Sequence, residues 1–191
     1  MEERIEVNIE DIRESNLADI PEACRGCVYW EYPEAFEQGK KDAVKTNAFE
    51  VKKNEWFAQT MKEFGTCGKI AYYEGAPVAY AQYAPSTRLP KIGSYGSKPA
   101  GKLEEGVVFL SCLYVSDETM RRQGVGERLL QNIIEDLRRR GFKAIETFAC
   151  RSGTDNPSGP MMFYVKNGFH LKDKSDPELP LMRLYLESIV P

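Results

Sequence analysis

Hydrophobic residues recur at helical spacing in two long segments of the chain. In residues 124–140, five aliphatic side chains fall on one face of a helix: Leu129, Leu130, Ile133, Ile134 and Leu137. In the polar segment 34–64, an i, i+4, i+7 pattern predicts an amphipathic helix in at least the later half, carried by Phe57, Met61 and Phe64. A short helix is also predicted at 160–167.

Apolar and alternating runs predict the strands. Residues 107–115 (VVFLSCLYV) are almost unbroken in apolarity, which is typical of a strand buried on both faces. Two runs, 69–73 and 78–83, are joined by a short link containing a glycine and predict a hairpin. Further strands are predicted at 4–8, 143–150, 169–172 and 181–186. Strands that alternate with helices in this way indicate an α/β fold with helices packed on a mixed sheet.

The segment 84–105 lies between the hairpin and the apolar strand. It is rich in Gly, Pro, Ser and Lys and shows neither a helical nor a strand pattern. Such a composition is typical of loops. We therefore predict a mobile loop there.

Composition and charge narrow the class of protein. The 191 residues are 42% hydrophobic and 29% charged, as in one ordinary globular domain. The 26 basic and 29 acidic residues give a net charge of −3, which argues against general nucleic-acid affinity. No apolar run approaches the ~20 residues that span a bilayer, and the N-terminus lacks an apolar signal region. With five cysteines, an odd number, a disulfide framework is not indicated, and we expect a cytoplasmic protein.

The link between the apolar strand and the long helix carries the candidate chemistry. It reads SDETMRRQGVG and places Gly124 and Gly126 where the helix starts. Glycines let a ligand approach the backbone, and the first N–H groups of a helix lack partners and carry partial positive charge. The link therefore predicts an anion site suited to a pyrophosphate. It is not a dinucleotide fingerprint, whose third glycine is replaced by Leu129, and no Lys-Ser or Lys-Thr pair makes it a P-loop.

Two motifs resemble one known family. RRQGVG at 121–126 is similar to the Q/R-x-x-G-x-G/A signature of the GNAT superfamily of acyl-CoA N-acyltransferases, and FYVKNGF at 163–169 resembles its F-Y-x-K-x-G-F segment. The resemblance covers about residues 107–186, and the preceding hairpin fits it. It implies an α/β fold with a central mixed, mostly antiparallel sheet of about seven strands flanked by helices.

The resemblance also implies one GNAT-like domain over residues 1–191. An acceptor-side segment would occupy 1–66, and a sheet core with the acyl-CoA site would occupy 67–191. The N-terminal CRGCVYWE, with a later TCG, resembles an uncharacterised subgroup of the family.

Several residues take roles from this resemblance. The backbone of Leu113 and Val115 would pair with the pantetheine arm of acetyl-CoA, as an added strand would. Asn156, before the short helix, would contact the cofactor as well. The pyrophosphate would be bound by the RRQGVG segment, that is by Arg121, Arg122, Gln123, Gly124, Val125 and Gly126.

The implied reaction transfers an acetyl group from acetyl-CoA to a primary amine by direct attack in a ternary complex. Tyr164 would be the general acid that protonates the departing thiolate, since a phenol of pKa ~10 stays protonated at neutral pH. Strand N–H donors near Leu113 would polarise the thioester carbonyl. The general base stays open among three carboxylates: Glu104, Glu105 and Glu146.

The expected partner is a small-molecule or peptide amine of unknown identity. Neither nucleic acid nor a membrane is expected as a partner, and a homodimer is left open. Five aromatic residues of the N-terminal segment could line an acceptor pocket or pack in the core: Tyr29, Trp30, Tyr32, Trp56 and Phe57.

Two alternative functions remain open at this stage. One is an acyl-CoA-binding domain without catalysis. The other is a metal or thiol redox module built on the CxxC pair, Cys24 and Cys27. Structural zinc needs four ligands, which Cys67 and His170 could complete, but buried inert thiols are favoured and no metal is expected.

Overall fold

One mixed sheet organises the part of the chain that the computed structural model describes, residues 5–41, 47–98, 104–151 and 159–186. Its seven strands lie in the order β1-β2-β3-β4-β5-β7-β6. Only the pairing of β4 with β5 is parallel, so the predicted mixed and mostly antiparallel sheet is confirmed. The strands are β1 (Asn8–Asp11), β2 (Gly68–Tyr73), β3 (Ala76–Ala84), β4 (Val107–Val115), β5 (Ala144–Phe148), β6 (His170–Asp173) and β7 (Leu181–Tyr185).

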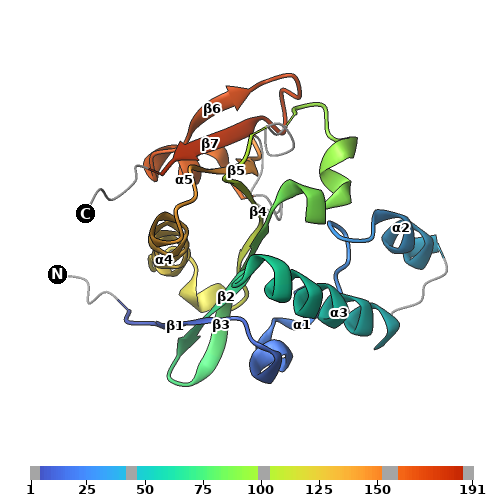
Figure 1. Ribbon diagram of the computed structural model, residues 1–191. Helices are drawn as coiled ribbons and strands as arrows, with labels where there is room; N and C mark the ends of the chain where they lie inside the picture. Colours follow the sequence, from blue (N-terminus) through green and yellow to red (C-terminus); the bar gives the residue numbers. More distant parts are fainter. Residues whose placement is uncertain (1–4, 42–46, 99–103, 152–158, 187–191) are drawn as a thin grey trace.

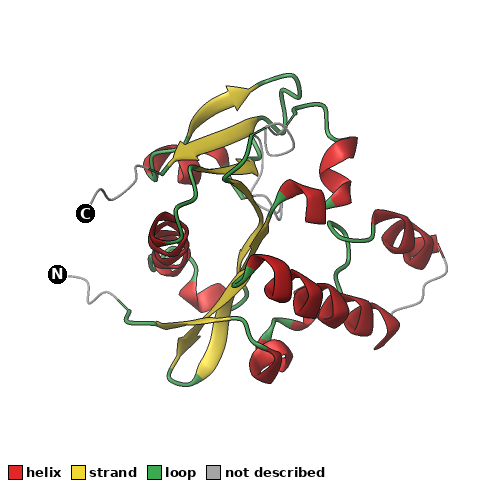
Figure 2. Ribbon diagram, viewed as in Figure 1, coloured by secondary structure: helices red, strands yellow, loops and turns green. Residues whose placement is uncertain are grey.

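Helices cover both faces of this sheet, as Figures 1 and 2 show. On one face lie α4 (Val125–Arg139) and α5 (Met161–Lys166), both close to their predicted bounds. On the other face lie α1 (Glu22–Arg25), α2 (Pro33–Lys41) and α3 (Asn47–Phe64). Short 3-10 turns are η1 (Glu14–Asp19), η2 (Ser86–Arg88), η3 (Pro90–Ser94) and η5 (Glu118–Met120). None of the helices in the described part combines the length and apolarity that crossing a bilayer requires.

The first strand differs from its prediction. It was predicted at 4–8 and instead occupies Asn8–Asp11, paired with β2 from Tyr72 to Lys69. In this register Asp11 lies opposite Lys69, and the ammonium of Lys69 bonds the carboxylate of Asp11, which stabilises the pairing. Alternation alone could not show it, because the deciding partner is contributed by a distant part of the chain.

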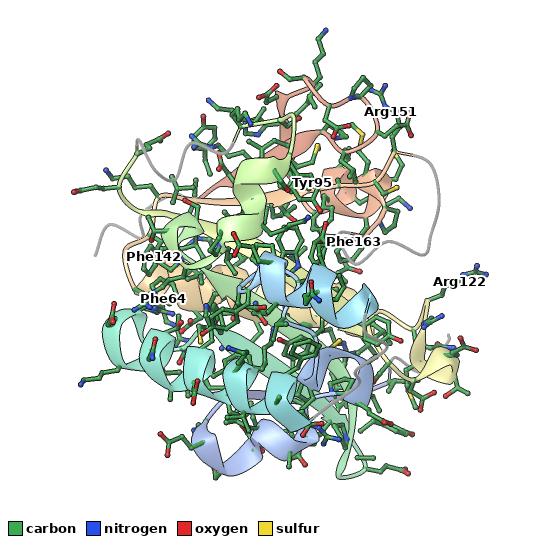
Figure 3. All side chains as sticks on the ribbon, turned by 90° about the vertical axis from the view of Figure 1, so that its right-hand side faces the viewer. Phe64, Tyr95, Arg122, Phe142, Arg151 and Phe163 are labelled. Carbon is green, nitrogen blue, oxygen red and sulfur yellow. The ribbon has the colours of Figure 1, made fainter. Side chains whose placement is uncertain are left out.

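The segment 84–105, predicted as a mobile loop, is packed over residues 84–98, while its residues 99–103 lie outside the described part. It forms η2 and η3, and Leu89 and Ile92 are buried in the core on the α3 face. Tyr95, near the middle of the face seen in Figure 3, stacks on Phe148 with ring centroids 4.2 Å apart. These three apolar side chains anchor the connection, so its polar composition was misleading.

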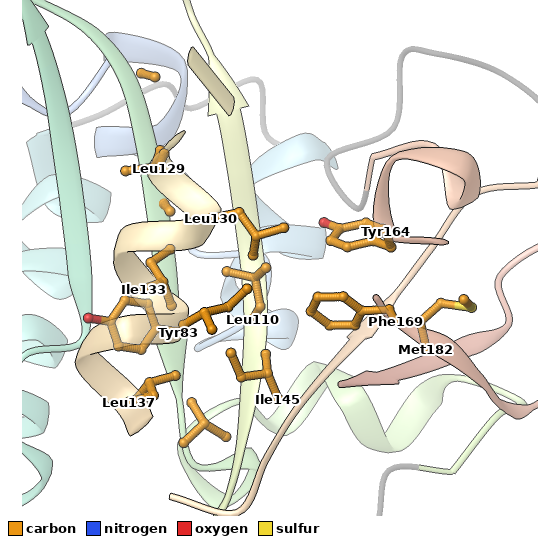
Figure 4. Close-up of a cluster of buried hydrophobic side chains, with 14 of the residues drawn as sticks. Tyr83, Leu110, Leu129, Leu130, Ile133, Leu137, Ile145, Tyr164, Phe169 and Met182 are labelled. Atoms are coloured by element: carbon orange, nitrogen blue, oxygen red, sulfur yellow. The ribbon is translucent and has the colours of Figure 1, made fainter. Parts of the chain in front are cut away.

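Each face of the sheet has its own hydrophobic core. On the α4 face, the predicted aliphatic stripe of α4 is buried against β3, β4 and β5 (Figure 4). On the α3 face, Trp30, Trp56 and Phe57 are buried with Phe109 and Phe148. Burial of one such side chain contributes about 1.5–3 kcal/mol. Packing therefore accounts for these three N-terminal aromatics, whereas two others, Tyr29 and Tyr32, are only partly buried.

Candidate active site

β4 and β5 diverge after three residue pairs. Their ladder joins Val107–Phe109 to Ala144–Glu146 and ends there. At the next position the Thr147 hydroxyl donates to the Leu110 carbonyl oxygen at 2.9 Å, so a side chain takes the place of a ladder bond. The second half of β4 is thus left with an edge that no described strand covers on the β5 side.

The backbone of Leu113 and Val115 faces this open edge. The Ser116 N–H donates to the Val78 carbonyl of β3 at 2.9 Å, and strand peptide groups alternate between sides. Leu113 and Val115 therefore point away from β3. The Val115 carbonyl accepts the Arg121 Nε–H at 3.2 Å, whereas Leu113 has no hydrogen-bond partner on this edge among the described residues. Leu113 can offer both a donor and an acceptor to an extended ligand.

The turn after β4 presents backbone N–H groups at the end of the open edge. Arg122 and Gly124 have φ values of +64° and +80°, a left-handed conformation that glycine adopts freely and arginine only with strain. Gly124 is the N-cap of α4 and supplies no side-chain cap. No backbone hydrogen bond between described residues uses the N–H groups of residues 122–126. N–H groups of this kind, together with the helix dipole, are able to bind an anion. Asn156 lies outside the described residues.

The first turn of α4 lies directly over β4. A Cβ at Gly126 would be 3.4 Å from Leu113 Cδ2, 3.7 Å from Val115 Cγ2 and 3.9 Å from Phe163 Cε2. Val125 is buried and fixes this turn to the core. The missing side chain therefore lets the first turn of α4 pack closely on the side chains of Leu113, Val115 and Phe163.

The charged residues of the motif differ in their surroundings. The Arg121 guanidinium bonds Val115 and the Glu118 carboxylate, so it holds the turn together. Arg122 and Gln123 are exposed, and Arg122 projects from the rim of the molecule (Figure 3). Of the two arginines, Arg122 is the one with a side chain available to a phosphate.

Tyr164 is buried beside the point where β4 and β5 diverge. Met161 N–H donates to the Cys150 carbonyl at 2.9 Å, which places the start of α5 next to the end of β5. The Tyr164 ring packs edge-on against Phe169, and its hydroxyl end points toward β4 (Figure 4). Burial raises the pKa of Tyr164, and a hydrogen bond with Thr147 acts in the opposite direction. The phenol is therefore protonated at neutral pH.

The three candidate bases have different surroundings. Arg183 binds Glu104 through two bonds of 3.1 and 2.9 Å, and it binds Glu146 at 3.0 Å. Both carboxylates are therefore held in an ion pair at the β5–β7 side of the sheet, away from Leu113. Glu105 is exposed.

A buried polar network on the α3 face was missed by the sequence analysis. Lys53 Nζ and Gln82 Nε2 both donate to Glu31 Oε1 at 2.5 Å, and the Tyr80 hydroxyl donates to Gln82 Oε1 at 2.6 Å. Burial lowers the pKa of Lys53, but Glu31 overcomes this effect and the net shift is upward. The four residues come from three separate segments, and no spacing in the sequence connects them.

The CxxC pair is not brought together with His170 as a zinc site would require. Cys24 and Cys27 are half-buried and free, and His170 is exposed on β6, where it stacks on Tyr185. β6 is the sheet edge farthest from the strand that follows Cys67. Within the described residues, no three Cys, His, Asp or Glu side chains converge as metal ligands do.

Comparison with known proteins bears on this site. A family profile described as Acetyltransferase (GNAT) family matches residues 27–169, well over half of the chain. The chain belongs to the GNAT acetyltransferase family. The profile spans β4, the glycine turn, α4 and α5, which are the elements that build the site. A search of curated proteins found no significant sequence match.

Solved structures share the fold of this GNAT protein at low identity. PaiA N-acetyltransferase from Thermoplasma acidophilum, in complex with coenzyme A, has a TM-score of 0.60 and 16% identity over 94% of this chain and 99% of its own. YncA from Salmonella typhimurium, a putative acetyltransferase with acetyl-CoA, has a TM-score of 0.60 and 16% identity over 97% and 96%. The ribosomal-protein-S18-alanine N-acetyltransferase of Escherichia coli has a TM-score of 0.55 and 16% identity, with 95% of each chain covered.

Proposed function

We propose that the protein is an N-acetyltransferase that moves an acetyl group from acetyl-CoA to a primary amine by direct transfer in a ternary complex. One observation carries the proposal. The open edge at Leu113 meets the unbonded N–H groups of residues 122–126, so a strand-like arm and a pyrophosphate can be bound at once. Fold relatives with coenzyme A or acetyl-CoA bound support the same assignment.

Cofactor binding would be divided between backbone and side chains. The N–H groups of residues 122–126 would accept the pyrophosphate oxygens, and the exposed Arg122 side chain would add charge. Leu113 would pair with the pantetheine amides. Arg121 and Val125 would act indirectly, by fixing the turn and the first turn of α4. Asn156 remains a proposed contact from the motif alone.

The chemical step would require the amine and the thioester to be held in position and one proton to be given to the leaving sulfur. The amine nitrogen attacks the thioester carbon, whose developing oxyanion is met by an N–H group of the open β4 edge near Leu113. As the C–N bond forms and the C–S bond breaks, Tyr164 gives its proton to the sulfur. The proton lost by the amine then restores the phenol, so atoms and charges balance.

Acetyl-CoA binding tests the proposal before an acceptor is known. At 100 times Kd, a ligand of the native state adds about 2.7 kcal/mol of stability, which in a protein of this size is a rise in Tm of roughly 5 to 10 °C. We expect this rise with acetyl-CoA and none with NADH, measured by differential scanning calorimetry. No response to acetyl-CoA, or an equal response to both, would contradict the proposed site.

A further inference from the structure

The place where β4 and β5 diverge, the fork, is crossed on the α3 face by residues 29–31. The Trp30 ring packs against Phe109 of β4 and Phe148 of β5, with ring centroids 5.8 and 6.4 Å apart. Phe109 is the last residue of β4 that pairs with β5, and Phe148 is the last residue of β5. Glu31 is the next residue along the chain, so it is held close to the point where the open edge of β4 begins.

The carboxylate of Glu31 lies over β3 at the level of Leu113. Its Oε1 accepts from Gln82 Nε2 and from Lys53 Nζ, each at 2.5 Å. Gln82 is the register partner of Cys112, which directly precedes Leu113 and belongs to the core on the α3 face. Gln82 and Glu31 therefore lie on that face, one residue pair away from the open edge at Leu113.

The second carboxylate oxygen of Glu31 lacks a partner. The residue is only 4% exposed, yet no described residue bonds its Oε2. Both donors bond the same oxygen and leave the other bare, although a buried polar atom without a hydrogen bond is unfavourable. The missing partner is therefore a molecule that the folded chain does not supply, either water or a substrate.

The α3 face is also the side from which an acceptor amine would approach. On the opposite face the first turn of α4 packs on Leu113, and Tyr164 is buried with its hydroxyl end toward β4 (Figure 4). The proposed cofactor site and acid therefore occupy that face. On the α3 face Tyr29 and Tyr95 are only partly buried, and their hydroxyls bond each other at 2.7 Å. Tyr95 stacks on Phe148, so this side of the fork borders solvent and offers an amine a way in.

We infer that Glu31 is the general base of the reaction, which takes the proton of the attacking amine on its free oxygen, directly or through one water. The inference rests on the proposed function, since Glu31 has this task only if an amine attacks acetyl-CoA at the open edge. The Lys53 ammonium stabilises the ionised carboxylate that a base requires. Glu104 and Glu146, by contrast, are both held by one arginine at the β5–β7 side of the sheet.

The step balances in atoms and charge. The nitrogen lone pair forms the C–N bond, the C–S bond breaks, and the sulfur takes the Tyr164 proton. The nitrogen, now positively charged, loses a proton to Glu31 Oε2, which leaves a neutral amide. Glu31 then gives this proton to water and the phenolate of Tyr164 takes one back, so both residues return to their starting states.

A charge-neutral variant tests the base. Glu31→Gln keeps the shape of the side chain and removes its basicity, so kcat should fall by ~10²- to 10⁴-fold with near-normal acetyl-CoA affinity. Turnover is measured as CoA release with ethylamine, benzylamine, spermidine and a short peptide as probe amines. Glu50→Gln is the matched control and should keep kcat, because Glu50 is a glutamate on α3 whose partly exposed carboxylate is paired with Arg25.

The buried ion pair allows catalysis to be separated from stability. Lys53→Met leaves the Glu31 carboxylate unpaired and destabilises the fold, whereas Glu31→Gln combined with Lys53→Met removes both charges and should restore stability. A purely structural Glu31 predicts that the more stable double variant is the more active of the two. A general base predicts the reverse order, because only Lys53→Met retains the carboxylate.

The outcomes are distinct. Full kcat in Glu31→Gln or in the double variant would overturn the role of Glu31 and leave the acetyltransferase in place. If Lys53→Met does not fold, a stable double variant with normal acetyl-CoA affinity and a ~10²- to 10⁴-fold lower kcat supports the base. Absence of acetylation of every probe amine by the wild type would overturn the proposed function, and this inference with it.

Discussion

Gly126 in the first turn of α4 packs directly on Leu113 of β4. A Cβ at position 126 would be 3.4 Å from Leu113 Cδ2, which is ordinary contact, so a side chain larger than alanine would press on the strand. The proposed pyrophosphate site and the proposed pantetheine edge meet at this point. The spacing between helix and strand is therefore what a substitution here would disturb.

Gly126→Val should weaken acetyl-CoA binding by roughly 10- to 100-fold, because the added methyl groups press on Leu113, Val115 and Phe163 and shift the backbone donors at the start of α4 relative to β4. The fold should persist, since Gly126 has an ordinary helical backbone and valine is not disfavoured there relative to glycine. Isothermal titration calorimetry measures the affinity. Gly93→Val is the control, because a Cβ there meets no atom within 4 Å. Equal affinities for the two variants would move the cofactor elsewhere.

Tyr164→Phe should lower kcat by ~10²- to 10⁴-fold with near-normal acetyl-CoA affinity, because a general acid acts in the transition state. Tyr83→Phe is a matched control: Tyr83 is buried in the same core, and its hydroxyl bonds Asp136 at 3.4 Å on the far side of α4. Steady-state turnover and cofactor titration are compared for both variants. A folded Tyr164→Phe enzyme with full kcat would remove this phenol from the mechanism.

Patterns among residues close in sequence predicted the elements on the α4 face of the sheet better than those on the α3 face. The apolar run at 107–115 and the stripe of α4 predicted their elements well, since both reflect burial by neighbours close in sequence. The glycine motif likewise predicted N–H groups without partners at the start of α4, because orphan N–H groups are a local property of a helix start. The fork at Thr147 could not be predicted, since it depends on where two strands stop pairing.

On the α3 face, by contrast, the sequence did not predict the main polar contacts. Glu31 is a single charge among aromatic residues, and nothing local indicates that Lys53 and Gln82 will meet it. The packed connection at 84–98 was also missed, because three apolar side chains outweigh its polar composition. Such contacts join distant segments, which periodicity and turn signals do not register.

Removing one partner of the buried Glu31–Lys53 ion pair should lower the free energy of unfolding strongly. Lys53→Met leaves a carboxylate uncompensated in the core, so we expect a loss of about 3–5 kcal/mol in the free energy of unfolding, measured with urea. Glu31→Gln combined with Lys53→Met should recover most of it. By contrast Glu50→Gln, which breaks a partly exposed pair with Arg25, should cost about 0.5 kcal/mol or less. A small effect of Lys53→Met alone would mean that the pair is solvated.

The half-buried Cys24 should be unreactive at neutral pH. Burial, with a smaller contribution from Cys27, raises its pKa to about 11, and burial raises that of Cys67 to about 12. Alkylation by iodoacetamide at pH 7.5 should be more than about 100-fold slower than for free cysteine, because the thiolate is the nucleophile. Peptide mass spectrometry after a time course measures it. Rapid modification of Cys24 would favour the thiol redox module.

The raised pKa values of Cys24 and Cys67 also determine the direction in which stability changes with pH. A pKa that is higher in the folded than in the unfolded state means that the folded state keeps its proton longer. The stabilisation of the folded state that comes from the two protonated thiols is complete below the unfolded pKa of about 8.5. It is lost as the pH rises toward their folded pKa values of about 11 and about 12. Urea titrations should therefore show falling stability above about pH 9. Substitution of Cys67 by alanine should flatten that fall.

We propose that the chain transfers acetyl groups as well as binding their carrier. The direct measurement is release of free CoA from acetyl-CoA across a library of primary amines, with mass spectrometry of the amine product. We expect amine-dependent release with at least one acceptor, an acetylated product in equal amount, and a large loss of rate in Tyr164→Phe. Tight acetyl-CoA binding without release on any amine would contradict it and leave a non-catalytic acyl-CoA-binding domain.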